Sequence, residues 1–153
     1  MATNTLKIPT RREYKPTGEL IETPTSELPF VRSETDNHWD VPLTDDSDGD
    51  ENDDIGMAAK IGAEYAGHYL QYLKDNSNIV GASLLGWIAQ DIDFDGPSSN
   101  TYWTSFFSQL ERVLYWAAMD MDVYGYIDRC NAHQDQFMAK LREDEEAEKG
   151  LHS

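Results

Sequence analysis

Basic residues are scarce in this sequence of 153 residues. Lysine and arginine number 12 against 29 aspartates and glutamates, which gives a formal net charge of −17. Proteins that bind DNA, RNA or anionic lipid directly carry clusters of lysine and arginine. The shortage of bases argues against direct binding to nucleic acid or to a membrane surface, and it indicates that the natural partner is a basic protein.

Cysteine and long apolar runs are also rare. Cys130 is the sole cysteine and cannot form an internal disulfide, so we expect a reducing compartment, the cytoplasm. No segment approaches the roughly 20 apolar residues that cross a bilayer, and the first thirty residues lack the apolar run of a secretory signal. We therefore expect no association with a membrane.

Motifs that carry catalysis or cofactor binding are missing from the sequence. It contains no glycine-rich phosphate loop, no nucleophile elbow and no metalloprotease helix. Cys130 and His133 are three residues apart, but two ligands are far short of a zinc site. Glu64 and His68 have the spacing of an ordinary i,i+4 helix pair. We expect a protein that is not an enzyme and that holds no metal or cofactor.

One segment resembles a calcium-binding loop. The stretch that begins at Asp91 reads DIDFDG, which matches the opening of an EF-hand loop between two predicted helices. The match then fails, because Pro97 takes the backbone-ligand position and Tyr102 stands where a bidentate glutamate closes the site. We interpret the segment as an acidic turn and expect no response to calcium.

Proline, in contrast, is concentrated near the start of the chain. Five of the six prolines fall in the first 42 residues, and the stretch 45–54 (DDSDGDENDD) holds seven acids. This composition predicts an extended, largely disordered arm over residues 1–54. Some of its residues are apolar enough to dock on a helical body or on a partner: Leu28, Phe30, Val31, Trp39, Val41 and Leu43.

Residues 55–153 have helical periodicity and predict an all-α domain, a small bundle of about four helices. We expect helices over 55–74, over about 80–92, from Tyr102 onward, and from about Val123, with a break near Gly125. The second helix is expected to turn Val80, Leu84, Trp87 and Ile88 inward. The inward stripe of the third comprises Trp103, Phe107, Leu110, Leu114, Ala117 and Met121. That of the fourth comprises Val123, Ile127, Cys130, Phe137, Met138 and Leu141.

The third helix also carries apolar residues on its other side. Tyr115, Trp116 and Met119 lie opposite the inward stripe, where a helix that rests on a core by one face does not need them. Two interpretations remain open. The helix is central and covered all round, or it carries a second interface.

Acidic residues form possible rows on the last two helices. Asp128 and Asp135 are one heptad apart, and Glu111 and Asp122 are expected to share a face of the preceding helix. Carboxylates in rows can imitate a phosphate track. The leading hypothesis is therefore a non-enzymatic protein that occupies a basic surface of another protein, such as a nucleic-acid-binding surface.

The composition resembles that of small acidic helical inhibitors of restriction and CRISPR systems, which phages and mobile elements encode, including DNA mimics. The resemblance implies a DNA-mimic or anti-CRISPR inhibitor, and it rests on composition and on no motif. The alternative hypothesis is an oligomeric structural or assembly protein that associates through the aromatic helix around Tyr115 and Trp116.

Overall fold

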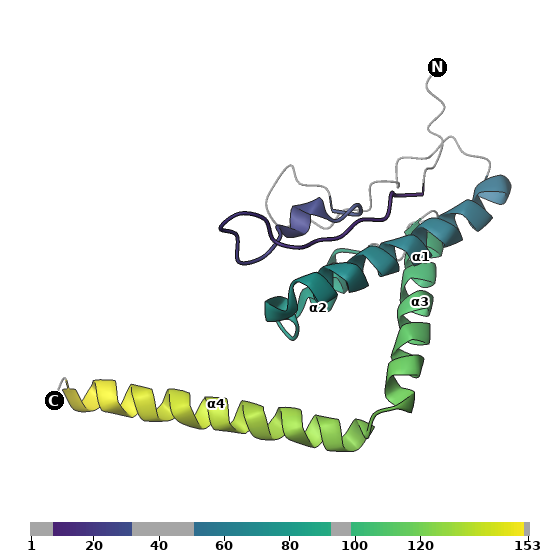
Figure 1. The fold of residues 1–153 in the computed structure, drawn as a ribbon. Coiled ribbons are helices and arrows are strands. Elements are labelled where there is room, and N and C mark those ends of the chain that lie inside the picture. Colours follow the sequence, from purple (N-terminus) through teal and green to yellow (C-terminus); the bar gives the residue numbers. More distant parts are fainter. Residues whose placement is uncertain (1–7, 32–50, 93–98, 152–153) are drawn as a thin grey trace. The chain divides into compact units, whose positions relative to one another are not determined.

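The computed structural model describes residues 8–31, 51–92 and 99–151. These residues contain four α-helices and no strand, and an extended arm precedes the helices (Figure 1). The predicted all-α fold class is therefore confirmed. The α-helices are α1 (Glu51–Asp75), α2 (Leu84–Asp91), α3 (Ser99–Met119) and α4 (Val123–Leu151), with short 3-10 helices at Thr25–Glu27 and Ser77–Ile79.

The chain divides into two compact units, Met1–Glu111 and Arg112–Ser153, and each is described by itself. The boundary falls within α3, which runs through Glu111 and Arg112 as one helix.

The helix α1 supplies more buried apolar residues to the core of the first unit than any other described helix. Its apolar residues recur every three or four positions, which brings them to one side of the helix. The buried ones are Ala58, Ile61, Tyr65, Ala66, Tyr69 and Tyr72. The helix begins at Glu51, within the acidic 45–54 stretch.

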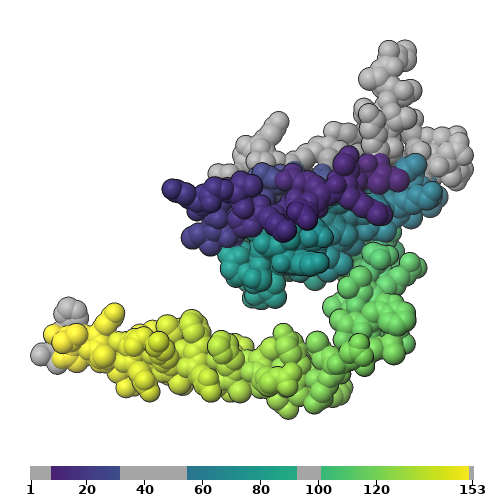
Figure 2. All heavy atoms as spheres, in the orientation of Figure 1, coloured from purple at the N-terminus to yellow at the C-terminus, as the bar shows by residue number. Residues whose placement is uncertain are grey.

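The described part of the arm, residues 8–31, lies along α1 (Figures 1 and 2). Tyr14, Leu28 and Phe30 are buried, and the Phe30 ring lies 5.7 Å from Trp103 and 5.8 Å from Phe106, between ring centroids. The docking expected of Leu28 and Phe30 is thus confirmed. Trp39, Val41 and Leu43 lie outside the described residues, and the predicted boundary after residue 54 stays a prediction.

A close approach between α1 and α3 depends on Gly62. A Cβ atom on this residue would lie 2.1 Å from the carbonyl oxygen of Tyr102, closer than any real contact. One turn away, the Ser105 hydroxyl donates a hydrogen bond to the carbonyl of Ala59. The absence of a side chain at Gly62 therefore allows this helix crossing.

The helix α2 presents a narrower apolar face than expected. Ile88 is buried and Leu84 packs against the core, but Val80 is 61% exposed and Trp87 is 58% exposed. The prediction for Val80 and Trp87 is wrong, because Val80 precedes the helix and Trp87 lies about 100° around it from Ile88.

The break between the last two helices is confirmed, since α3 ends at Met119 and α4 begins at Val123. The inward stripes are correct only in part. Trp103 and Leu110 are buried, but Leu114 is 64% exposed, and no residue of α4 is buried. Periodicity identified the apolar face of α4. Whether that face is covered depends on tertiary contacts, which the spacing of residues within one helix does not predict.

Candidate functional site

Residues 113–119 of α3, which read VLYWAAM, form the most apolar surface of the second unit. We refer to this segment as the apolar belt, because at 100° per residue its side chains encircle the helix. Leu114, Tyr115, Trp116 and Met119 are each about 60–70% exposed. A helix that is apolar all round is ordinarily covered all round, but these side chains are exposed. Their cover must therefore come from a further interface, which is the second of the two interpretations.

Tyr115 and Trp116 are the predicted aromatic site residues, and both project from the belt. Their ring centroids are 5.7 Å apart at an interplanar angle of 77°, an edge-to-face contact. Each ring supports the position of the other while leaving most of its surface accessible. Such exposed, partly fixed aromatic side chains are typical anchors of protein interfaces.

Glu111 and Asp122 do not share a helix, which corrects the sequence-based expectation. Glu111 is the last residue of the first unit, whereas Asp122 lies in the turn after α3 has ended. Asp122 Oδ1 accepts a hydrogen bond of 3.2 Å from the backbone N–H of Gly125. This places Asp122 at the N-cap of α4, where an acidic side chain satisfies a free backbone donor.

Asp128 and Asp135 do share a helix. Both are exposed on α4, and seven residues bring them back to the same side of the helix with a drift of about 20°. The acids toward the end of α4, at positions 143–146 and 148, are helical as well. Negative charges at the C-terminal end of a helix oppose its dipole. Helix stability therefore does not explain them.

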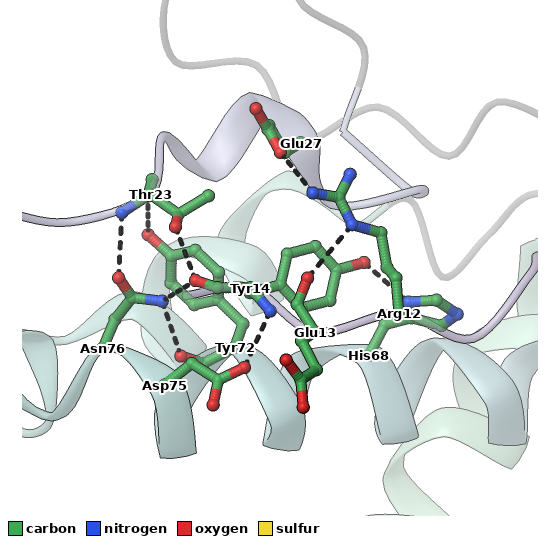
Figure 3. A network of polar contacts seen from close by, with 9 residues as sticks. All are labelled: Arg12, Glu13, Tyr14, Thr23, Glu27, His68, Tyr72, Asp75 and Asn76. Atoms are coloured by element: carbon green, nitrogen blue, oxygen red, sulfur yellow. Dashed lines mark hydrogen bonds and ion pairs between the residues drawn. The ribbon is translucent and has the colours of Figure 1, made fainter. Parts of the chain in front are cut away.

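A buried polar network under the arm was missed by the sequence analysis (Figure 3). Asn76 Nδ2 donates to the backbone carbonyls of Tyr14 at 2.9 Å and Tyr72 at 3.0 Å, and its Oδ1 accepts from the N–H of Thr23 at 2.8 Å. The hydroxyl of Tyr72 donates to the Thr23 carbonyl at 2.5 Å. Locally Asn76 looks like a helix-ending residue, so no sequence signal pointed to this role.

Glu64 and His68, predicted as a pair with each other, are each bound by the arm. The Arg11 guanidinium donates to both carboxylate oxygens of Glu64, at 2.6 and 2.9 Å, and this hydrogen bonding lowers the pKa of Glu64. The Tyr14 hydroxyl lies 2.6 Å from His68 Nδ1. Burial lowers the pKa of His68, so its imidazole is neutral at pH 7.

An open pocket of about 410 Å³ lies beside these contacts. Its polar and charged lining residues are Arg11, Arg12, Glu64, His68, Gln71 and Gln109. Arg11 pairs with Glu64, and Arg12 pairs with Glu27 at 2.7 Å. The arginine charges that line the pocket are therefore compensated within the chain: Arg11 attaches the arm to α1, and Arg12 pairs with a residue of the arm itself.

The candidate metal-binding residues are not brought into a larger set. Cys130 and His133 are both exposed on α4, and no group of three or more potential ligands occurs in the part of the chain that the structure describes. The Asp91 loop beyond Ile92 lies outside the described residues, so the calcium prediction stays a prediction. None of the described helices has the length and apolar composition that a bilayer crossing requires.

Comparison with known proteins gives no match to this chain among protein-family models, curated proteins or solved structures.

Proposed function

We propose that this chain is a non-enzymatic, acidic binding protein that occupies a basic, nucleic-acid-binding surface of a partner protein. One observation carries the proposal. The unit Arg112–Ser153 presents an apolar belt and exposed rows of carboxylates, and no residue of α4 is buried. A helix with this surface gains little from packing within its own unit, so its sequence is better explained by what it binds.

The surface has the two parts that a protein interface requires. Tyr115 and Trp116 can fill apolar pockets of a partner, and charged residues around such anchors form a polar rim. Asp128 and Asp135 are about 10 Å apart along α4, from a rise of 1.5 Å per residue. That spacing corresponds to about three steps of 3.4 Å along one DNA strand. A groove that binds phosphates can therefore accept both carboxylates.

Composition and cysteine chemistry support a biological setting for this proposed function. The exposed, unpaired Cys130 is suited to a reducing compartment, and we propose that the protein acts in the cytoplasm. Its resemblance in composition to small acidic inhibitors of restriction and CRISPR systems supports the same role here, exclusion of nucleic acid from a partner.

The test compares two charge reversals that change the net charge equally. Asp128→Lys with Asp135→Lys alters the α4 row, whereas Glu19→Lys with Glu22→Lys alters exposed residues of the arm. Each variant and the wild-type chain are immobilised, and host proteins captured by each are identified by mass spectrometry. We expect a basic protein that binds the wild-type chain and the arm variant but not the α4 variant.

The captured protein is then purified and titrated at two salt concentrations, with nucleic acid as competitor. Charge-driven binding weakens as the Debye length falls from about 10 Å at 0.1 M salt to about 3 Å at 1 M. Nucleic acid should compete for the same surface. Affinity that ignores salt, survives saturating nucleic acid and collapses on Trp116→Ala would show that the interface is apolar, and the proposal would be wrong.

A further inference from the structure

The face of α4 opposite its acidic row has the pattern of a coiled-coil seam. Residues recur along it at alternating steps of four and three and stay within about 40° of one line down the helix. We refer to them as the α4 seam: Val123, Ile127, Cys130, Gln134, Phe137 and Leu141. All six are exposed in the structure, and α4 is continuous from the first seam residue, Val123, past the last one to Leu151 (Figure 1). A seam of this kind is complete only against a second helix.

We infer that α4 pairs with α4 of a second copy of this chain as an antiparallel two-helix coiled coil. In heptad notation the seam residues alternate between positions a and d, and antiparallel pairing brings each a position of one helix opposite a d position of the other. With the twofold axis at residue 132, Val123 faces Leu141 of the second copy and Ile127 faces its Phe137. Cys130 faces Gln134, and this polar layer beside the axis fixes the register, as single polar core residues do in coiled coils.

The residues that flank the seam explain why a second copy is a suitable occupant. A chain with a net charge of −17 repels itself, so self-association requires an interface with few acids. The flanking positions are Tyr124, Tyr126, Asn131, His133, Met138 and Lys140, and none of them is acidic. The same register brings Lys140 to the Tyr126 ring of the second copy, a favourable cation–π arrangement.

Charge also determines the orientation. Glu143, Asp144, Glu145, Glu146 and Glu148 lie in the last three turns of α4. In a parallel pair these ten carboxylates would lie on helices about 10 Å apart, within one Debye length at 0.1 M salt. In the antiparallel pair, the two Glu145 residues are about 40 Å apart at 1.5 Å per residue. Antiparallel pairing therefore avoids the repulsion.

The seam and the acidic row can be used at the same time. Asp128 and Asp135 lie roughly 120–140° around α4 from the centre of the seam. A dimer would carry two such rows, one on each outer face. The inference is independent of the proposed function, because dimerisation is measured on the purified chain with no partner present.

Sedimentation equilibrium of the purified full-length chain tests the pairing. We expect a species of twice the chain mass of 17.4 kDa that dissociates on dilution. Ile127→Lys with Phe137→Lys should weaken dimerisation at least about a hundredfold, because it buries unpaired charges. Ala132→Lys with Ala139→Lys is the matched control, since it adds the same charge on the opposite face. The control should remain a dimer.

Disulfide formation tests the orientation. In the antiparallel register Cys130 lies opposite residue 134 of the second copy but is displaced from the second Cys130 by about 6 Å along the axis. Gln134→Cys should therefore yield a covalent dimer under oxidation, whereas the wild-type chain and Cys130→Ser with Gln134→Cys should not. Helix content measured by circular dichroism confirms that each variant is folded.

Three outcomes would overturn the inference. A wild-type monomer at every concentration would mean that the seam has another occupant, either this chain's first unit or a different protein. A dimer that both lysine pairs leave intact would place the interface elsewhere. Covalent dimers from either single-cysteine chain would indicate parallel helices.

Discussion

Asn76 joins two segments that are distant in the sequence, the arm and the end of α1. Its side chain is 1% exposed and bonds Tyr14, Thr23 and Tyr72, so it holds the arm to the end of α1. A buried amide in such a position contributes mainly through the groups that it leaves unsatisfied when removed. Asn76 is therefore one of several attachments of the arm, beside the Arg11–Glu64 pair and the Tyr14–His68 contact.

Replacement of Asn76 by alanine should destabilise the protein by roughly 2–4 kcal/mol, since at least the Thr23 N–H and the Tyr14 carbonyl each lose a partner. Urea unfolding followed by circular dichroism measures the change. Asn78→Ala is the control. Its side chain makes one exposed hydrogen bond to Glu22, and the expected change is within about 0.5 kcal/mol. Equal losses in the two variants would contradict the role given to Asn76.

His68 gives stability a pH dependence whose sign follows from its environment. Burial lowers the pKa of His68 below 6.5; a backbone hydrogen bond with Pro9 and the charge of Glu64 oppose this with smaller effects, and Arg12 and Arg11 lower the pKa further. As the pH falls through about 6.5, the unfolded chain binds a proton there and the folded chain does not. The free energy of unfolding should fall from pH 7.5 toward pH 5.5. His68→Gln should flatten this slope, and the exposed His133→Gln should leave it unchanged.

At the scale of elements, the position of α3 against α1 depends on a single missing methyl group. Gly62 lies where a Cβ would overlap the Tyr102 carbonyl, whereas Gly67, one and a half turns later, has no neighbouring atom within 4 Å of its Cβ position. The same substitution thus has two different costs on one helix. Substitutions at these two glycines therefore test how closely α1 and α3 approach each other.

Gly62→Ala should therefore destabilise the protein by about 1–3 kcal/mol, because backbone must move to admit the new atom. Gly67→Ala should instead stabilise it by up to about 1 kcal/mol, the gain in helix propensity. Thermal unfolding of the two variants side by side provides the measurement. If both alanines stabilise, the two helices are farther apart than described.

The comparison of sequence and structure is most informative for the helices. Local periodicity was sufficient to locate all four, and Trp103 and Leu110 are buried as predicted. It failed for Leu114 and for the α4 stripe, which have the same pattern but no covering element in their unit. Of the candidate site, the shared row of Asp128 and Asp135 was predictable because seven residues nearly complete two turns. The N-cap role of Asp122 was not, because it depends on where α3 ends.

At the scale of the whole molecule, the net charge of −17 opposes association with any other acidic surface. Salt reduces this repulsion and also reduces attraction to a basic surface. The two associations inferred for α4 therefore differ in the sign of their salt dependence. This difference separates them without any mutation.

Dimerisation through the α4 seam should strengthen as salt is raised from 0.1 M to 1 M, which reduces the Debye length from about 10 Å to about 3 Å. Binding to the basic partner should weaken over the same range. Analytical ultracentrifugation and partner titration in matched buffers give the two slopes. Slopes of equal sign would mean that one of the two interfaces is misassigned.

The packing of the arm has a consequence for the newly synthesised chain. Phe30 is translated 76 residues before Phe106, whose ring it contacts in the folded protein. At about 5–20 residues per second, translation leaves the Phe30 side chain without this partner for roughly 4–15 seconds. During that interval Leu28 and Phe30 are part of a short apolar segment on a growing polypeptide, available to ribosome-associated chaperones before the protein's own core exists.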